Sequence, residues 1–521
     1  MPPSASSWGI RRAWGAALSG LLLLGLAACA SLPPQEGRSV SSAYTDTTDT
    51  RLGRAIGPKL QAHPGLDGIV PLQDGVDAFA ARALLARTAQ RSLDIQYYIW
   101  RNDPSGVLLF DALRSAADRG VRVRLLLDDN NTAGLDPLLA ALDAHPDIEV
   151  RLFNPYVHRQ QRLLGLLTDF GRLNRRMHNK SFTADNQVSI VGGRNIGDEY
   201  FDASPGVSFV DLDVMTLGPV VQEISRDFDR YWASASSYPL ASLLADEAPV
   251  APADIAGEAA RIRQAPAAQA YAQALKESTV VQTLLADNSP TLWAPARLVS
   301  DEPSKGLNGA RREDMLLPRL VAILGQPHKE LLLVTPYFVP TAAGMRGLAS
   351  LVASGTQVSI LTNALEATDV LAVHAGYAKW RVRLLQAGIH LYEMKRTAPT
   401  PARARLRNLG SSASSLHAKT FAVDGRRLFV GSFNFDPRSA RLNTEMGLVI
   451  DSPEATAGMT RDFAAGLRNT AYEVRLDDAG EVVWLDHSVE PARVLKEEPG
   501  TSVLKRAWID LLSLLPLDWL L

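Results

Sequence analysis

The sequence has a single cysteine, Cys29, among 521 residues, and it has no excess of charge of either sign. One cysteine excludes a disulfide framework and a thiolate metal site. Lys+Arg 54 against Asp+Glu 56 gives a formal net charge of -2, without the basic bias that non-specific nucleic-acid binding favours. We therefore expect no nucleic-acid partner, and a nuclease is disfavoured.

Long apolar runs are also missing, except for one at the N-terminus. This run follows Arg11 and Arg12 and ends in Leu26-Ala27-Ala28-Cys29, which predicts an export signal over residues 1–29. The last four residues resemble a bacterial lipoprotein box, which implies lipidation of Cys29. Because Ala30 follows Cys29, the resemblance implies that the protein is anchored on the periplasmic face of the outer membrane. The alternative is ordinary cleavage at this small-residue site. No later segment has the roughly 20 apolar residues that cross a bilayer.

A chain of this length exceeds the size at which one core keeps growing, so two similar lobes are expected. Composition and pattern predict the following order: a signal peptide (1–29), a flexible tether rich in Ser, Thr, Pro and Gly (30–66), a first lobe (67–248), a helical connector (249–310), a second lobe (311–485) and an apolar C-terminal tail (486–521). The tail either lies in a membrane interface or docks onto the body.

Two stretches that lie 239 residues apart carry the same chemical groups at the same offsets. MHNKSFTAD and LHAKTFAVD both read His-x-Lys-x4-Asp, and in each half a Gly and an Asn follow the His at 14 and 17 residues. These residues are His178, Lys180, Asp185, Gly192 and Asn195 in the first half, and His417, Lys419, Asp424, Gly431 and Asn434 in the second. A single motif of this kind can arise by chance. Two motifs with repeated flanks indicate a duplicated unit and one composite active site.

The chain around each motif also repeats. SLDIQYYIW, a helical stretch and VRVRLLLDD predict β-α-β in the first half, and ELLLVTPYFV, GMRGLASLVASG and TQVSILTNAL predict it in the second. Tyr98 and Tyr337 each lie 80 residues before the His of their half. Each motif itself reads as strand, turn, strand. Residues two apart in a strand share a face, so each His and Lys are expected to point the same way.

This combination suits a phosphodiester. Lys neutralises non-bridging oxygens, one neutral His attacks phosphorus, and the other His protonates a poor alkoxide leaving group. No metal or cofactor is expected, because each His has a repelling cation two residues away. Asp185 and Asp424 occupy turn positions and are expected to brace the motifs.

Further residues are predicted to support the site. Glu445 is predicted to orient His417, and Asp213 is its predicted counterpart in the first half. Two arginine clusters precede the motifs, and they either attract anionic head groups or form solvated loops: Arg172, Arg175 and Arg176, and Arg403, Arg405 and Arg407. His374, which has no metal-ligand spacing around it, is interpreted as a structural histidine.

The paired motifs resemble the phospholipase D superfamily, whose members carry two HKD motifs and use a phosphohistidine intermediate without a metal. GGRNIGDEYF, LTNALEATDVLAVHAGYAKWR and GSFNFDPRSARLNTEMG are similar to bacterial cardiolipin synthases, particularly the C-type branch. The resemblance implies an α/β fold of two homologous lobes, each a mixed β-sheet flanked by helices, with the active site at the lobe interface. It also implies His178 as nucleophile and His417 as acid, with Lys180, Lys419, Asn195 and Asn434 around the phosphate.

The expected function is transfer of a phosphatidyl group to phosphatidylglycerol at a membrane surface, which makes cardiolipin through a phosphohistidine. Phosphatidylethanolamine is a possible donor. A hydrolytic phospholipase D that releases phosphatidic acid remains an alternative, because acceptor choice depends on pocket shape and water exclusion. A non-catalytic envelope lipoprotein is a second alternative, although two complete His/Lys sets argue against it.

Overall fold

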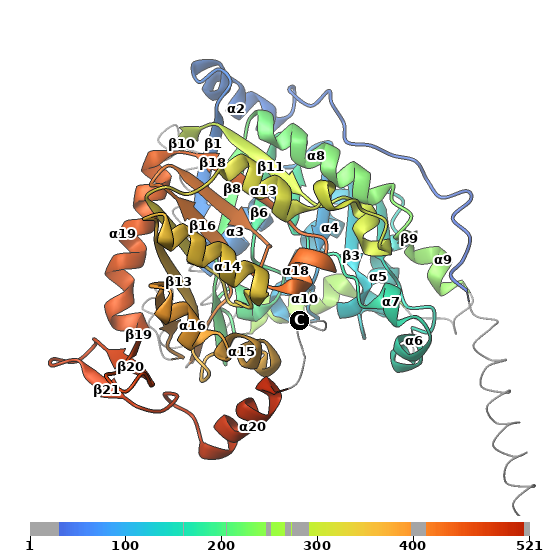
Figure 1. Ribbon diagram of the computed structural model, residues 1–521. Helices are drawn as coiled ribbons and strands as arrows, with labels where there is room; N and C mark the ends of the chain where they lie inside the picture. The colour runs from blue at the N-terminus through green and yellow to red at the C-terminus, as the bar shows by residue number, and fades with distance from the viewer. Residues whose placement is uncertain are drawn as a thin grey trace, which may run out of the picture.

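A computed structural model describes residues 31–159, 161–204, 206–245, 252–265, 272, 291–396 and 413–514. The predicted signal peptide with Cys29, and the second arginine cluster (Arg403, Arg405 and Arg407), lie outside these residues. Two large mixed sheets dominate the fold, each with helices packed against it (Figure 1).

The first sheet has nine strands in the order β10-β1-β8-β6-β5-β2-β3-β4-β9. Their bounds are β1 (Asp67–Leu72), β2 (Ser92–Tyr97), β3 (Arg122–Asp128), β4 (Ile148–Phe153), β5 (Ser181–Ala184), β6 (Val188–Gly192), β8 (Asp213–Leu217), β9 (Ser237–Pro239) and β10 (Leu292–Ala294). The helices of this half are α2 (Arg51–Ala62), α3 (Gly75–Thr88), α4 (Pro104–Ala117), α5 (Asp136–Asp143), α6 (Arg162–Thr168), α7 (Phe170–Leu173), α8 (Pro219–Trp232), α9 (Leu240–Leu244) and α10 (Ile255–Gln264).

The second sheet has ten strands in the order β11-β18-β17-β16-β12-β13-β14-β19-β20-β21. Their bounds are β11 (Ala296–Ser300), β12 (Glu330–Val334), β13 (Gln357–Asn363), β14 (His390–Met394), β16 (Thr420–Val423), β17 (Arg427–Gly431), β18 (Met446–Asp451), β19 (Ala471–Leu476), β20 (Val482–Asp486) and β21 (Arg493–Leu495). The helices are α13 (Leu316–Leu324), α14 (Thr341–Ala353), α15 (Leu371–Ala378), α16 (Arg381–Gln386), α18 (Pro437–Arg441), α19 (Pro453–Thr470) and α20 (Val503–Ser513).

The two sheets share one plan, which confirms the predicted pair of mixed α/β lobes. Strands β2, β3 and β4 run parallel, as do β12, β13 and β14, while the motif strands β5 and β16 run antiparallel beside β2 and β12. Ser181 therefore pairs with Gln96 near the end of β2, and Thr420 pairs with Val334 at the end of β12. Each motif thus lies at the carboxyl ends of its parallel strands, the edge of such sheets where ligands usually bind. We call this the carboxyl edge.

The lobes are joined through a shared core and a small sheet. Ile69 and Val214 of the first sheet lie in the same buried cluster as Leu332 and Leu448 of the second. Strand β7 (Val207–Val210) of the first half pairs in parallel with β15 (Ala413–Leu416) of the second. Each lobe also has a core cluster of its own, and this third cluster buries apolar side chains of one lobe against those of the other.

The described part of the predicted helical connector contains strands as well as a helix. Helix α10 packs against α4, but two strands follow it, separated only by Pro295. Strand β10 pairs with β1 in the first sheet, and β11 pairs with β18 in the second. The boundary between the lobes thus falls at Pro295, because each sheet takes an edge strand from the connector.

Residues 31–66 also differ from the predicted flexible tether. Arginines on the first sheet donate to backbone oxygens of this segment: Arg122 to Ser42, Arg124 to Ser41 and Arg151 to Ser39, at 2.6–2.9 Å. Helix α2 follows directly. The segment is therefore part of the first lobe, because the guanidinium groups of that lobe donate to backbone carbonyls that the segment does not pair by itself.

The C-terminal tail begins inside the second sheet, since β20 ends at Asp486 and β21 follows. Helix α20 then docks on α15, where Ile509 is buried with Leu365 and Ala375. Docking of the tail onto the body, one of the two predicted alternatives, is confirmed for the described part. Over the residues that the structure describes, no helix is both long and apolar enough to span a bilayer.

Candidate active site

Each motif histidine is fixed to the opposite lobe by its own backbone. The His178 amide donates to the carbonyl of Thr444 at 2.9 Å, and the His417 amide donates to the carbonyl of Val210 at 2.8 Å. His178 and Lys180 lie just before β5 rather than within it, as His417 and Lys419 do before β16. The two half-sites therefore meet at the lobe interface, as predicted.

The carboxylates that orient the histidines are also exchanged between the lobes. His178 Nδ1 lies 2.8 Å from Glu445 Oε2, and His417 Nδ1 lies 2.6 Å from Asp211 Oδ2. In each case the carboxylate comes directly after the residue whose carbonyl binds the histidine amide. A proton on Nδ1 that is donated to the carboxylate leaves Nε2 as the reactive nitrogen.

Two predicted roles are corrected by this arrangement. Glu445 was predicted to orient His417, but it contacts His178, because the lobe interface brings each carboxylate to the histidine of the other half. Asp213 was predicted as the first-lobe partner, but it forms a buried ion pair with Arg82 at 2.7 Å. Asp211 takes the role instead. The sequence VDLD offered both acids, and only the contact across the interface distinguishes them.

Glu445 is held by groups that the sequence analysis missed. Ser439 donates to Oε1 at 2.7 Å, Ser432 donates to Oε2, and the Glu445 amide donates to Asp301 Oδ2 at 2.9 Å. Both serines lie in GSFNFDPRS, which begins at the last residue of β17. For Ser432, the position beside the repeated Gly431 was the available signal.

The lysines lie beside the histidines in a buried, charged cluster. Lys180 Nζ donates to the His178 carbonyl at 2.6 Å, and Lys419 Nζ lies 2.9 Å from His417 Nδ1. Burial lowers the pKa of Lys180 to about 7 and that of Lys419 to about 8. Two lysines near each other without full hydration form a strong site for a phosphate anion. A bound phosphate would stabilise the protonated form of both lysines and so restore their charge.

The two imidazoles differ electrostatically. Burial, with the charges of Lys180, Lys419 and His417, holds the pKa of His178 well below its usual value. The pKa of His417 is also lowered by burial and by Lys419, but Asp211 opposes this change. Each side chain keeps a small exposed fraction, 9% for His178 and 8% for His417, so both rings reach solvent.

The orienting acids differ in the opposite sense. Burial raises the pKa of Glu445 to about 7. Burial also acts to raise the pKa of Asp211, but His417 and Lys419 outweigh it and leave this pKa below its usual value. Asp211 is therefore the stronger stabiliser of a cationic imidazole, and His178 is the ring more firmly held neutral.

Asp185 and Asp424 brace the motif hairpins, as predicted, and do not contact the imidazoles. Asp185 accepts from the amides of Gln90, Arg91 and Ser92, and Asp424 accepts from those of the equivalent residues His328, Lys329 and Glu330. Both aspartates have positive φ, 51° and 54°, which suits the tight turns of two-residue hairpins.

The two predicted asparagines have different partners. Asn195 accepts from the Ile99 amide at 3.1 Å and donates to the Tyr200 hydroxyl at 3.0 Å, so its side chain positions the loop after β2. Asn434 Oδ1 is buried and has no hydrogen-bond partner among the described residues. Of the two, Asn434 retains an unpaired acceptor, which a water or the hydroxyl of an acceptor lipid would satisfy by donating to it.

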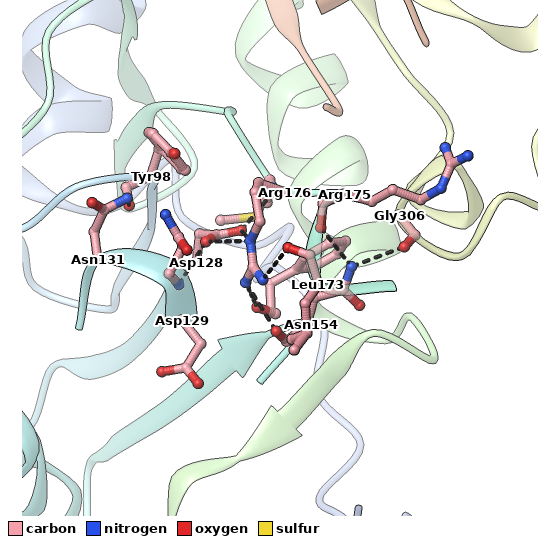
Figure 2. Close-up of polar contacts among 12 residues, drawn as sticks. Tyr98, Asp128, Asp129, Asn131, Asn154, Leu173, Arg175, Arg176 and Gly306 are labelled. Carbon is pink, nitrogen blue, oxygen red and sulfur yellow. Dashed lines mark hydrogen bonds and ion pairs between the residues drawn. The ribbon is translucent and has the colours of Figure 1, made fainter. Parts of the chain in front are cut away.

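The first arginine cluster turns inward. Figure 2 shows Arg176 packed between Asp128, Leu173 and Asn154, with Asp128 oxygens 2.9 and 3.1 Å from its Nε. Asp128 also accepts from the Met177 amide at 2.7 Å, directly before His178. Arg175 contacts the carbonyl of Lys305, and Arg172 pairs with Asp169. The solvated-loop interpretation is therefore wrong for Arg176, which braces the peptide that carries His178.

His374 is structural, as interpreted. It is buried, and its Nε2 lies 2.8 Å from Arg381 Nη2 and 3.5 Å from Glu498. Within the described residues no group of three or more His, Cys, Asp or Glu side chains is arranged to hold a metal ion.

The chain matches known proteins over most of its length. The family model described as "Cardiolipin synthase, PLD-like domain" matches twice, over residues 84–232 and 320–466. The chain is 49% identical over 479 residues to "Cardiolipin synthase C" of Escherichia coli (strain K12), covering 90% of this chain and 100% of that protein. It is 33% identical to an uncharacterised protein of Helicobacter pylori (strain ATCC 700392 / 26695), covering 80% of this chain and 82% of that one.

Among solved structures, phosphatidylserine synthase of Haemophilus influenzae Rd KW20 superposes with a TM-score of 0.55 at 16% identity. The superposition covers 89% of this chain and 96% of that one. At this identity the likeness concerns the fold alone, and it supports the two-lobed architecture.

Proposed function

The chain belongs to the cardiolipin synthase family of PLD-like domain proteins, and from this membership we propose that it is a phosphatidyltransferase that makes cardiolipin. The observation that carries the proposal is the reciprocal exchange of carboxylates, Glu445 to His178 and Asp211 to His417. Two oriented imidazoles and two lysines in one buried cluster suit an in-line displacement at phosphorus, which needs a nucleophile and an acid together.

In the first step, His178 Nε2 attacks the phosphorus of one phosphatidylglycerol. The nitrogen–phosphorus bond forms as the bond from phosphorus to the oxygen of the head-group glycerol breaks. That oxygen takes the proton from His417 Nε2. Lys180 and Lys419 neutralise the non-bridging oxygens. The electrostatics support this allocation, because burial and nearby cations hold the pKa of His178 well below its usual value, whereas Asp211 opposes the lowering at His417.

In the second step, a hydroxyl of another phosphatidylglycerol attacks the phosphohistidine. His417 takes the hydroxyl proton, the oxygen–phosphorus bond forms, and the nitrogen–phosphorus bond breaks. The products are cardiolipin and the glycerol released earlier. With phosphatidylethanolamine as donor, ethanolamine leaves instead, by the same transfer of a proton from His417.

A product assay tests the reaction. Purified protein is incubated with labelled phosphatidylglycerol, with and without phosphatidylethanolamine, and the lipids are separated. Cardiolipin with the release of glycerol is expected, whereas phosphatidic acid alone would identify a hydrolase. A denaturing quench at alkaline pH, where the nitrogen–phosphorus bond is stable, is expected to trap a phosphatidyl group on histidine, and the His178→Ala protein is the control that loses this adduct. A protein that forms no adduct and turns over no lipid would be a binding lipoprotein.

The proposal includes a place in the cell envelope. Cys29, in Leu26-Ala27-Ala28-Cys29-Ala30, is the lipidated residue, and the anchor holds the protein on the periplasmic face of the outer membrane. Incorporation of labelled fatty acid into the parent but not into Cys29→Ser, with membrane fractionation, tests this. Labelling that survives in the variant, or recovery of the parent in the inner membrane, would contradict it.

A further inference from the structure

Helix α6 carries large apolar side chains on its outer face. Leu163 is 77% exposed and Leu167 is 84% exposed, and Leu164 and Phe170 are also exposed. The opposite face is closed, because a Cβ added at Gly165 would lie 3.1 Å from Leu173 and 3.3 Å from Tyr156. The helix therefore presents its leucines to the outside while its glycine packs inward, an arrangement that typically marks an interaction surface.

The helix is held firmly and lies close to the catalytic machinery. Arg162 donates to the Asp129 carbonyl at 2.6 Å, and Arg159 pairs with the Asp129 carboxylate at 2.7 Å. The loop that contains Asp129 continues to Asn131, whose side chain donates to the carbonyl of Tyr98 at 3.3 Å. The Tyr98 ring packs edge-on against His178 at 4.9 Å. A short series of contacts therefore connects the exposed leucines to one catalytic imidazole.

The second lobe has a comparable surface on α20, which carries two apolar stripes. One stripe, with Ile509 and Leu512, packs on α15. The other follows the i, i+4, i+7 spacing of a helix face and points outward: Leu504 is 83% exposed, Trp508 is 53% exposed, and Leu511 is exposed. A helix with one stripe docked and another left open is suited to contact a second apolar phase.

Helix α20 is also tied to the catalytic site. It rests on α15, and Asp369, which precedes α15, accepts from the Tyr337 hydroxyl at 2.7 Å. Asp369 lies near enough to Lys419 to influence its pKa. Figure 1 shows α6 and α20 at the same lower side of the molecule, one from each lobe. The first described residues lie beside β9, since Gln35 donates to the carbonyl of Ser237, which pairs with the end of β4.

We propose that α6 and α20 together form a lipid-docking surface that seats the carboxyl edge on a phospholipid bilayer. The inference rests on the proposed function, because it takes the substrate to be a membrane phospholipid. Diacyl substrates keep their chains in the apolar phase while the phosphate reaches the imidazoles between the lobes. A second copy seated on both helices would cover this approach, so a lipid surface is the occupant that fits.

A single-cysteine labelling experiment tests the surface in the full chain. Leu167→Cys and Trp508→Cys are labelled with a polarity-sensitive fluorophore, and Val321→Cys on α13, where the parent side chain is 57% exposed, is the matched control. The parent, labelled in parallel, measures any probe on Cys29. With phosphatidylglycerol vesicles, probes at positions 167 and 508 are expected to shift to shorter wavelength and to be quenched by nitroxides on the acyl chains. The probe at 321 is expected to do neither.

Activity measurements separate this inference from the proposed function. Leu167→Glu and Trp508→Glu are each expected to lower turnover of phosphatidylglycerol in vesicles about tenfold, because each removes one apolar side chain that the docked protein buries in the bilayer. Turnover of monomeric dihexanoyl phosphatidylglycerol should stay at the parent value, as should both activities of Val321→Glu.

Each other outcome has a definite meaning. Probes that stay water-exposed while the parent turns over both lipids would overturn the docking surface and leave the proposed function intact. Probes that insert while no lipid reacts would leave the docking surface intact and overturn the proposed function. A shift that depends on protein concentration, without lipid quenching, would assign the helices to a second copy and would also overturn the surface.

Discussion

The two motif histidines have identical neighbours in sequence but different surroundings in space. Glu445, next to His178, is buried and has its pKa raised to about 7, whereas Asp211, next to His417, has a lowered pKa. A carboxylate that stays ionised favours an imidazolium, and a partly protonated one does not. This asymmetry supports the proposed roles, with His178 as the nucleophile and His417 as the acid, in a site that looks symmetric in sequence.

Exchange of the leaving group tests these roles. Asp211→Asn is expected to slow turnover of phosphatidylglycerol by about 10²–10⁴-fold, the usual contribution of an acid, because His417 loses the charge that supports its protonated form. The loss should be much smaller for phosphatidyl-p-nitrophenol, whose leaving group needs no proton. Single-turnover rate constants for release of the leaving group measure the difference, because the second step needs His417 as a base for both substrates.

Two variants serve as controls for Asp211→Asn. Glu445→Gln should slow both substrates to a similar extent, since the nucleophile acts on each. Asp213→Asn breaks the buried pair with Arg82, so it should lower the melting temperature without any dependence on the leaving group. Equal losses for the two substrates in Asp211→Asn would mean that His417 is not the acid.

The pH dependence of turnover follows from the same assignment. His417 must hold a proton, and burial and Lys419 lower its pKa below the ordinary 6.5. For the free protein, kcat/KM for phosphatidylglycerol is therefore expected to fall as pH rises through a value below 6.5. Lys419→Met removes a charge that lowers this pKa, so the falling limb should move to higher pH. A limb below pH 6.5 that persists with phosphatidyl-p-nitrophenol would contradict the assignment, whereas a limb near pH 7 is expected for both substrates from Lys180, whose pKa is about 7.

At the scale of elements, the sequence predicted those parts of the fold that depend on local pattern. The β-α-β units and the hairpin turns at Asp185 and Asp424 are where alternation and turn residues indicate them. The exchange of Glu445 and Asp211 was not predictable, because spacing within a half does not reveal which half a side chain will face.

Docking of residues 31–66 was missed for a similar reason. The partners that hold this segment are Arg122, Arg124 and Arg151, which belong to strands far along the chain. The composition of the segment describes only its own low apolar content. Whether carbonyls remain solvated or find guanidinium donors is decided by the tertiary fold.

The braced hairpins give a matched pair of stability predictions. Asp185→Ala is expected to lower the free energy of unfolding by about 3 kcal/mol, because three amides lose their acceptor in a buried setting. Asp424→Ala removes the equivalent bonds at an exposed position, so its cost should be clearly smaller. Urea denaturation measures both.

Catalytic measurements complete the test of the hairpin aspartates. Asp424→Asn keeps an acceptor and tolerates the left-handed turn, so it should restore most of the stability that Asp424→Ala loses. The rate per folded molecule should change little in all three variants. A large loss of kcat in a fully folded Asp185→Ala protein would instead support direct participation of this carboxylate.

For the whole molecule, the lobes share one buried cluster in addition to the core of each. The central buried cluster draws Ile69, Val214 and Ile224 from the first half and Leu332 and Leu448 from the second, and neither half covers these side chains alone. The catalytic pairs cross the same boundary. Stability and catalysis therefore depend on one interface.

Separation of the halves tests this coupling. The full chain is expected to unfold in urea in one transition, followed both by tryptophan fluorescence and by loss of activity, because both report the same interface. Residues 31–294, expressed alone, should bind a hydrophobic dye and show no sharp thermal transition, since the shared cluster is then open to water. They should also form no phosphohistidine, because Glu445 is absent. A first half that melts cooperatively at the temperature of the full chain, or two separate unfolding transitions, would show that each lobe has a self-sufficient core.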